Sequence, residues 1–289
     1  MRLNMEEQKT MLKIFSQADI ESFKPEMKIG LLATINQDGL PHLTLISTLQ
    51  ASTPTELFWG QFAEGLSKHY IRENPRTGFL IMTLDKNLWR GKARFTRTAR
   101  EGREYDILNN LPLFRYNSYF GVHTVYYMDL VEQHGREALP MGRVVQASIK
   151  TIIAKTMAGK ENDEKILNLF TIKLINKIDN LKFLAYIDGD GYPFIIPVIQ
   201  AQTAGNERVI FSSSAYTDDL NAVPQGSSVA LFGMSLEMQS VLLRGKYRGI
   251  RSIGGISCGE MGVNWVYSPM PPKAEQIYPP TKLDPVTDF

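Results

Sequence analysis

The chain has 289 residues, 43% of them apolar, which is enough for one large domain or two ordinary ones with packed cores. Its 32 basic and 30 acidic residues leave a formal net charge of +2, so no field of one sign predicts nucleic acid or a membrane as a partner. It has a single cysteine, Cys258, no apolar signal core near the start and no apolar run long enough to span a membrane, so a cytoplasmic protein is expected.

Residues 1–27 are predicted to form a lead-in helix that packs against the residues that follow. Met11, Ile14, Phe15 and Ala18 recur at helical spacing and share one face, while Pro25 closes the segment. The expected role of this helix is packing.

A β-rich domain is predicted over residues 28–147, and it begins with a hairpin. Asp38 and Gly39 form a short turn in which glycine supplies a positive φ, and Pro41 keeps the next residues extended. Apolar and β-branched residues flank the turn on both sides, as in half-buried strands. Further strands are expected at residues 56–60, 77–84, 88–96 and 122–131.

A short helix between two of these strands has a start that favours an anion. Ser67 is the expected N-cap, and Asn74 with Pro75 ends the helix. Backbone N–H groups at the helix start, the Ser67 hydroxyl and the Lys68 ammonium together suit a phosphate group. Both residues also have ordinary alternatives, Lys68 as a solvated lysine and Ser67 as a cap alone.

The opening pattern returns in the second half of the chain, after a helical connector at residues 148–179. The turn glycines Gly39 and Gly191 lie 152 positions apart, and the Arg-Gly-Lys units that begin at Arg90 and Arg244 lie 154 apart. Two pairs of matching motifs are thus separated by nearly the same number of residues, and this number is about the length of a domain. Such a repeat indicates a duplicated domain. Residues 180–267 are therefore predicted to form a second, degenerate β-barrel.

The second copy lacks the phosphate corner of the first. Its counterpart segment, residues 215–228, has no lysine and no Asn-Pro exit. Because Arg90 and Arg244 occur in both copies, we interpret them as features of the fold. The proline-rich residues 268–289 are expected to form an extended arm or a loose end.

Taken in order, four motifs resemble the pyridoxamine 5′-phosphate oxidase-like split barrels, which bind FMN. They are the Asp-Gly-x-Pro hairpin, the aromatic third strand, the Ser-Lys helix with its Asn-Pro exit, and the strand that ends in Arg-Gly-Lys-Ala. The resemblance covers residues 27–147 well and residues 180–265 loosely. It implies a mainly β fold with peripheral helices, in which two tandem split β-barrels form an intramolecular pseudo-dimer with FMN in the cleft between barrels.

Carried over by position, the resemblance also implies cofactor-binding residues. Trp59 and Gly60 correspond to the strand end beside the flavin, although core packing is the ordinary alternative for Trp59. Ser67 and Lys68 correspond to the pair that holds the phosphate.

Two further cofactor-binding positions, Thr44 and Lys86, complete the implied set, and the first departs from the family pattern. Thr44 falls where the oxidases carry a strand-two arginine, and Lys86 falls near a position that contacts the ring edge. Serine at position 67 also replaces an arginine, which leaves Lys68 as the strong cation for the phosphate. The C-terminal tryptophan- and arginine-bearing signature of true pyridoxamine phosphate oxidases is missing, so a vitamin B6 oxidase is not expected.

The resulting hypothesis is an FMN-binding flavoprotein, an oxidoreductase that acts with a small-molecule redox partner. The alternatives that stay open are a non-catalytic flavin carrier or sensor, a barrel that has lost its cofactor altogether, and a split barrel that uses deazaflavin F420 or haem. The sequence names no catalytic residue, and four histidines without paired spacing give no metal site. Whether two chains pair again as a homodimer is also left open.

Overall fold

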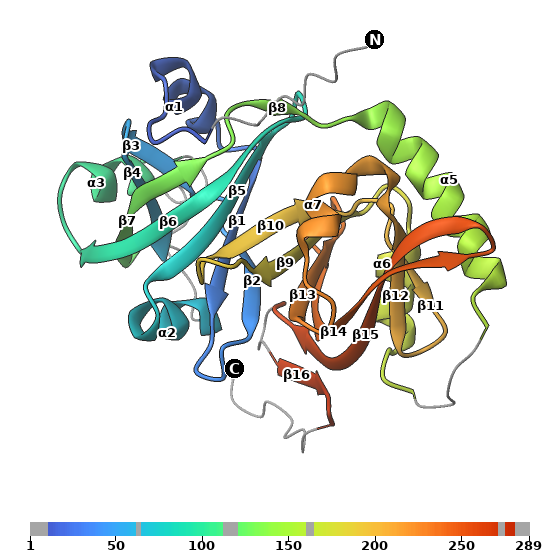
Figure 1. Ribbon diagram of the computed structural model, residues 1–289. Helices are drawn as coiled ribbons and strands as arrows, with labels where there is room; N and C mark the ends of the chain where they lie inside the picture. The colour runs from blue at the N-terminus through green and yellow to red at the C-terminus, as the bar shows by residue number, and fades with distance from the viewer. Residues whose placement is uncertain (1–10, 62–64, 112–120, 160–164, 271–274, 281–289) are drawn as a thin grey trace, which may run out of the picture. The chain divides into compact units, whose positions relative to one another are not determined.

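The computed structural model describes residues 11–61, 65–111, 121–159, 165–270 and 275–280 (Figure 1). The chain divides into two compact units, residues 1–34 with 45–139 and residues 35–44 with 140–289. Each half of the chain contributes its own eight-stranded sheet. Among the helices in these described stretches, none is long and apolar enough to cross a membrane.

The first half of the chain forms a sheet with the strand order β2-β1-β5-β6-β7-β4-β3, and β8 pairs with β6. Its helices are α1 (Gln17–Phe23), α2 (Leu66–Glu73) and α3 (Arg103–Asn109), and its strands are β1 (Lys28–Ile35), β2 (Pro41–Leu45), β3 (Gln50–Thr53), β4 (Glu56–Gln61), β5 (Arg76–Thr83), β6 (Asn87–Ala99), β7 (Thr124–Gln133) and β8 (Glu137–Ala138). Figure 1 shows α1 and α2 at opposite ends of this sheet.

The second half forms a sheet with the order β10-β9-β13-β14-β15-β12-β11, and β16 pairs with β15. Its helices are α5 (Met141–Met157), α6 (Leu169–Asn176), the 3-10 helix η1 (Ser213–Ala215) and α7 (Thr217–Ala222). Its strands are β9 (Leu181–Ile187), β10 (Pro193–Pro197), β11 (Gln202–Ala204), β12 (Arg208–Ser212), β13 (Ser228–Met234), β14 (Ser240–Ile253), β15 (Ile256–Ser268) and β16 (Glu275–Tyr278).

The two strand orders are the same when each strand of the first sheet is matched to its counterpart in the second. β1 corresponds to β9, β5 to β13 and β6 to β14, and every pairing described between these strands is antiparallel. The predicted fold class, mainly β with two tandem split barrels, is confirmed. The pseudo-dimer arrangement of the two barrels stays a prediction.

The first-strand hairpins of the two copies close through the same turn. In the first, the Asn36 N–H donates to the Leu40 carbonyl (3.0 Å) and the Gly39 N–H donates to the Asn36 carbonyl (3.0 Å). In the second, the Gly191 N–H donates to the Asp188 carbonyl (2.9 Å) in the same way. Gly39 has φ +72° and Gly191 has φ +80°, which are left-handed values that favour glycine. The predicted turn is confirmed in both copies.

The glycine of each repeated Arg-Gly-Lys unit is required by the packing of the fold. A Cβ atom on Gly91 would lie 2.1 Å from the Glu132 carbonyl oxygen, and one on Gly245 would lie 1.8 Å from the Gly262 carbonyl oxygen. In each copy the neighbouring strand therefore occupies the space of the missing side chain. The hydrogen-bonded register shifts close to both glycines, which marks a β-bulge.

The lead-in helix is shorter than predicted, because α1 begins only after Ser16. The Asp19 backbone N–H donates to the Ser16 hydroxyl (3.1 Å), and the Ser16 backbone N–H donates to the Asp19 carboxylate (2.9 Å). This capping box holds Ser16 in an extended conformation and so fixes the helix start. Ile14, expected on the packed face, is 58% exposed, whereas Phe15 is buried as expected.

Two other segments differ from expectation. The connector helix α5 begins at Met141, inside the region predicted for the first barrel. In the described part of the proline-rich tail, β16 pairs with β15. The expectation of a loose end is therefore wrong for these four residues. The predictions for residues 1–10, 62–64, 112–120, 160–164, 271–274 and 281–289 lie outside the described residues.

Candidate functional site

Helix α2 carries Ser67 and Lys68 in its first turn. Its N-cap is Gly65, which makes no side-chain cap hydrogen bond, and its first turn contains no acidic residue. The prediction that Ser67 caps the helix is therefore wrong, because the helix begins at Leu66 and Ser67 lies inside it. The helix start presents backbone N–H groups and the positive end of the helix dipole without a carboxylate of its own.

Ser67 and Lys68 are both buried, with 3% and 8% of their surface exposed. They share this burial with Ile71, which is fully buried and belongs to the core of the first unit. Residues three and four positions apart lie on the same side of a helix, so Ile71 holds this side of α2 against the core. The Lys68 ammonium is thereby placed in a setting of low polarity, where interactions with an anion are stronger than in water.

Arg72 and Tyr126, two residues that the sequence analysis missed, join α2 to the sheet. The Arg72 guanidinium donates through Nη2 to the Tyr126 hydroxyl (3.3 Å), and Tyr126 lies in β7. The Tyr126 ring stacks on the Trp59 ring with centroids 4.2 Å apart and planes 8° from parallel. Arg72 lies four residues after Lys68, and residues at this spacing lie on the same side of a helix. This spacing could have identified Arg72 from the sequence.

Trp59 and Gly60 lie next to each other near the end of β4. The Trp59 ring is fully buried in the core, which matches the packing alternative for this residue. Gly60 is required by packing as well, because a Cβ there would come within 2.8 Å of Leu108 and Val122 side-chain atoms. Thr48, which the sequence analysis also did not identify, makes two hydrogen bonds with Gly60. The Gly60 N–H donates to the Thr48 hydroxyl (3.1 Å), and this hydroxyl donates to the Gly60 carbonyl (3.3 Å).

Lys86 lies in the turn between β5 and β6 and has φ 64°. Because α2 leads into β5 and this turn follows it, the eight residues of β5 separate Lys86 from Lys68. The structure brings Ser67 and Lys68 together but places Lys86 elsewhere.

Thr44 lies in β2 and is half-buried. It belongs to residues 35–44, which group with the second unit. The relation of Thr44 to α2 therefore stays a prediction.

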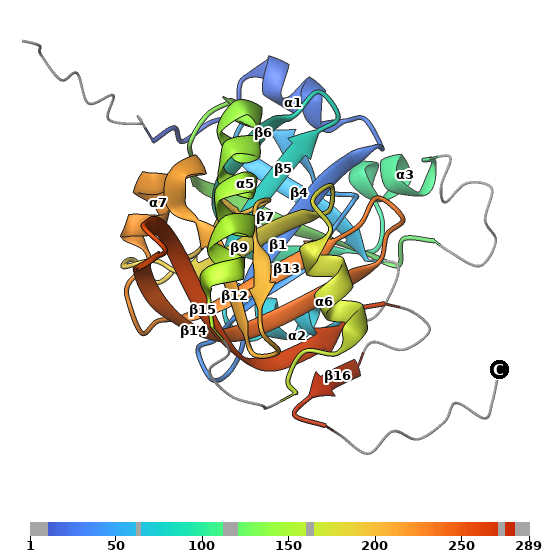
Figure 2. The same ribbon diagram turned by 90° about the vertical axis from the view of Figure 1, so that its right-hand side faces the viewer.

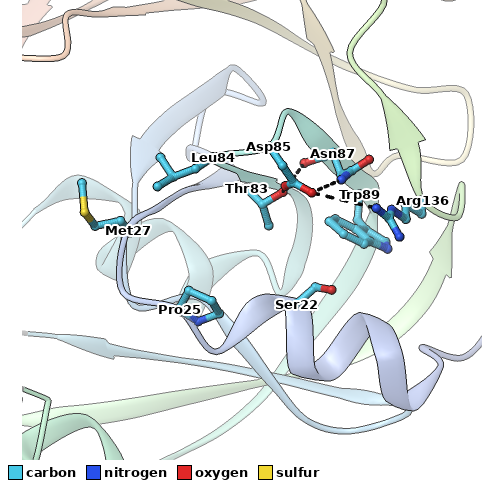
Figure 3. A pocket seen from close by; sticks show the side chains of 9 residues that line it. All are labelled: Ser22, Pro25, Met27, Thr83, Leu84, Asp85, Asn87, Trp89 and Arg136. Carbon is cyan, nitrogen blue, oxygen red and sulfur yellow. Dashed lines mark hydrogen bonds and ion pairs between the residues drawn. The ribbon is translucent and has the colours of Figure 1, made fainter.

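A pocket of about 350 Å³ opens in the first unit beside the turn that carries Lys86 (Figure 3). Its lining residues are Ser22, Pro25, Met27, Thr83, Leu84, Asp85, Asn87, Trp89 and Arg136. The Asp85 carboxylate accepts hydrogen bonds from Thr83 and Asn87 and lies 3.9 Å from the Arg136 guanidinium. The Thr83 hydrogen bond above all, with smaller contributions from Asn87 and Arg136, holds the pKa of Asp85 below its usual value. An exposed carboxylate at its rim makes this pocket a poor place for a phosphate.

Helix α7 occupies in the second copy the place that α2 has in the first, between the counterparts of β4 and β5. Its first turn carries two carboxylates, Asp218 and Asp219. Two negative charges at a helix start interact favourably with the helix dipole and repel an anion. The first turn of the helix in the second copy is thus acidic, whereas that of the helix in the first copy contains Lys68.

No protein-family model matches the chain, and no curated protein matches it. Among solved structures, an FMN-binding protein from Syntrophomonas wolfei subsp. wolfei is 14% identical with a TM-score of 0.34, and the match covers 40% of this chain and 81% of that chain. A candidate pyridoxamine 5′-phosphate oxidase from Lactobacillus delbrueckii is also 14% identical (TM-score 0.33, 42% of this chain and 94% of that chain). An F420 reductase is 12% identical (TM-score 0.34, 41% and 98%). At such identities and TM-scores these structures give neither ligand nor activity for this chain.

Proposed function

We propose that the first copy binds FMN with its phosphate at the start of α2, and that the protein is a flavin-dependent oxidoreductase other than a vitamin B6 oxidase. The observation that carries the proposal is the pair of buried residues Ser67 and Lys68 in a first turn without acidic residues. When bound, FMN supplies the transfer of electrons or a hydride to or from a small-molecule redox partner.

The donors at this helix start fit a phosphate monoester. In the first turn the Lys68 N–H donates to the Gly65 carbonyl (3.3 Å), while the Leu66 and Ser67 N–H groups point toward the helix start, where the dipole adds partial positive charge. The Lys68 ammonium adds a full charge, and charge-assisted hydrogen bonds to phosphate are stronger than neutral ones. The buried hydroxyl of Ser67 adds a further donor.

The contrast between the copies supports a site in the first copy alone. The start of α2 has a lysine and no acid, and the start of α7 has Asp218 and Asp219 and no lysine. The two helices have the same place in the strand order, so fold alone does not account for the difference in charge. We therefore expect one FMN per chain.

The resemblance implies four further cofactor contacts, and the proposal assigns them to the backbone or to parts of FMN other than the phosphate. Because the Trp59 ring is buried against Tyr126, Trp59 would contact the flavin through its backbone. Gly60 would do the same, since it has no side chain and its surroundings leave no room for one. Thr44 and Lys86 would contact other parts of the cofactor than the phosphate.

Replacement of Lys68 by alanine tests the phosphate site. The loss of one charge-assisted contact should weaken FMN binding by about 1.5–3 kcal/mol, which is a rise in Kd of roughly 10- to 150-fold. The Kd is measured by titrating the full chain into FMN and following the quenching of flavin fluorescence.

His69→Ala is the matched control, because His69 is the exposed neighbour of Lys68 on the same helix. It should leave the Kd unchanged within a factor of about two, a few tenths of a kcal/mol. An unchanged Kd for Lys68→Ala, or an equal loss for His69→Ala, would place the phosphate elsewhere.

The redox part of the proposal has a separate test. The FMN-loaded protein is mixed anaerobically with NADH, NADPH and other reductants, and the flavin absorbance is followed. Bleaching by one of these donors at a catalytic rate supports an oxidoreductase. Tight FMN binding with no bleaching by any donor would indicate a flavin carrier or sensor, and retention of F420 or haem in place of FMN would replace the cofactor in the proposal.

A further inference from the structure

Helix α5 has its larger apolar side chains on the side that faces away from its sheet. The inner side, which packs on β11, β12, β15 and η1, consists mainly of small residues: Val144, Ala147, Ser148, Thr151 and Ala154. The outer side carries six exposed apolar residues, here called the outer face of α5: Met141, Val145, Ile149, Ile152, Ile153 and Met157. Figure 2 shows the helix in front of the strands of the second sheet.

Specific polar contacts hold the inner side in place and so fix which side is outermost. The Ser212 backbone N–H of β12 donates to the Thr151 hydroxyl (2.9 Å), and the Thr151 hydroxyl donates to the Ala147 carbonyl (2.8 Å). Both Thr151 and Ala147 are fully buried. Rotating the helix to bury the outer face would break the bond between Ser212 and Thr151 and leave the buried Ser212 N–H without a partner. The exposure of the apolar side chains is therefore built into the fold.

The charges on α5 are all of one sign and flank the outer face. The helix contains Arg143, Lys150 and Lys155 and no acidic residue. At about 100° per residue, the six apolar residues occupy an arc of about 160°, with Lys150 and Arg143 beyond one edge and Lys155 beyond the other. The whole-chain charge of +2 hides this local excess, so the net charge alone did not predict a membrane as a partner.

A second copy of the chain is a poor match for this face. In a two-fold pairing of this face with the same face of a second copy, parallel or antiparallel, only basic side chains meet along the edges, because α5 contains Arg143, Lys150 and Lys155 and no acidic residue. Either arrangement brings like charges together, which destabilises the pair. A partner that complements this face is therefore apolar at its centre and negatively charged at its edges.

An anionic lipid surface has this chemistry. Its hydrocarbon boundary accepts aliphatic side chains without shape matching, while lysine and arginine at the edges of the helix extend toward the lipid phosphates. The outer face contains only Ile, Val and Met and none of the Trp, Tyr or Arg anchors that dominate protein–protein hot spots. The helix has 17 residues, or about 25 Å, which suits a helix that lies in the interface and is too short and too charged to span it.

We propose that the outer face of α5 binds the surface of an anionic membrane, with the helix lying parallel to the bilayer. The face adds a membrane-attachment function to the proposed flavin chemistry and does not depend on it. The contact is peripheral and reversible, because one helix face with three basic residues gives moderate affinity.

The test is co-sedimentation of the full chain with two kinds of vesicle, phosphatidylcholine alone and phosphatidylcholine with phosphatidylserine at roughly three to one. Wild type should bind the mixed vesicles, and more weakly the neutral ones. Arg143→Gln with Lys150→Gln should weaken binding to the mixed vesicles roughly 30-fold, about fivefold for each charge removed. Ile149→Gln with Ile153→Gln should weaken it roughly tenfold or more for both kinds of vesicle.

Ile107→Gln is the matched control, because Ile107 in α3 is 39% exposed, much as Ile153 is at 43%, and lies outside the outer face of α5. It should leave vesicle binding unchanged. Absence of wild-type binding to the mixed vesicles, or equal binding by wild type and the Ile149/Ile153 variant, would overturn the proposal. A concentration-dependent dimer that only the Ile149/Ile153 change abolishes would assign the face to a second copy, and capture of an acidic protein without vesicle binding would assign it to a protein partner.

Discussion

Gly91→Ala should lower the free energy of unfolding of the first unit by about 3 kcal/mol or more. The new Cβ would stand 2.1 Å from the Glu132 carbonyl oxygen and 2.8 Å from a Phe79 ring carbon. The oxygen belongs to the backbone of β7, so the strand itself would have to move, and its hydrogen bonds to β6 would be lost nearby. Urea unfolding followed by circular dichroism measures the effect as a lower midpoint.

Two further variants serve as comparisons for Gly91→Ala: Gly142→Ala as a control, and Gly245→Ala as the equivalent change in the second copy. Gly142 lies in the first turn of α5 with no atom near the place of a Cβ, so alanine there should be neutral or stabilising by up to about 1 kcal/mol. Gly245 is the counterpart of Gly91 in the second copy, and its alanine variant should destabilise the second unit for the same reason. If Gly91→Ala unfolds at the wild-type midpoint, the account of the Arg-Gly-Lys repeat as a device for close strand approach is wrong.

Acidification should destabilise the protein through His42, by about 5 kcal/mol between pH 6.5 and pH 3. His42 lies in β2, is 2% exposed, and its ring meets the Tyr267 ring edge to face with centroids 5.9 Å apart. Burial first, and then the positive charge of Arg244, lower the pKa of His42 to about 3. The Arg244 guanidinium itself stacks over the Trp265 ring at 3.6 Å, which keeps it in place.

The direction of the pH effect on the free energy of unfolding follows from the number of protons that each state binds. Between pH 6.5 and pH 3 the unfolded chain binds a proton at His42 and the folded chain does not, so each lower pH unit favours unfolding by about 1.4 kcal/mol. The contribution to stability is complete above pH 6.5 and is lost as the pH falls toward 3.

His42→Asn removes this titration, although its stability at neutral pH changes as well. The measured quantity is therefore the slope of unfolding free energy against pH, from urea unfolding at a series of pH values. Wild type should show the steeper fall between pH 6.5 and pH 3. Parallel slopes for wild type and His42→Asn would contradict the assignment of His42 as a buried neutral histidine.

The sequence predicted those parts of the fold that depend on backbone geometry at single residues. Gly39 and Gly191 were identifiable because a tight hairpin turn needs a positive φ, and the structure has it in both copies. The repeat at Arg90 and Arg244 was identifiable because its glycine must make room for a neighbouring strand. Such requirements are local and keep the same residue types in both copies.

The candidate site was predicted in part, and the failures have physical reasons. The prediction that Lys68 lies at the start of a helix was correct, but the predicted N-cap, Ser67, was wrong. Serine is a more frequent N-cap than glycine, and the sequence does not fix a helix start to within one or two residues, so Ser67 was preferred to Gly65. The roles of Arg72 and Thr48 depend on contacts with Tyr126 and Gly60 across the sheet, and sequence spacing does not encode contacts of that kind.

The outer face of α5 shows a further limit of sequence analysis. The connector was predicted to be helical, but both of its sides contain apolar or small residues. The choice of inner side depends on how closely α5 approaches β12, and small residues such as Ala147 permit the close approach. Only the packed structure reveals that Ile149 and Ile153 lie outside.

The most direct test of the central claim is the amount of FMN bound per chain after the full-length protein has been saturated with FMN and freed of excess ligand. Wild type should retain one FMN per chain, Lys68→Glu should retain none, and Asp218→Asn with Asp219→Asn should still retain one. A wild-type protein that retains no FMN, or a Lys68→Glu variant that retains as much as wild type, would contradict a phosphate site at the start of α2.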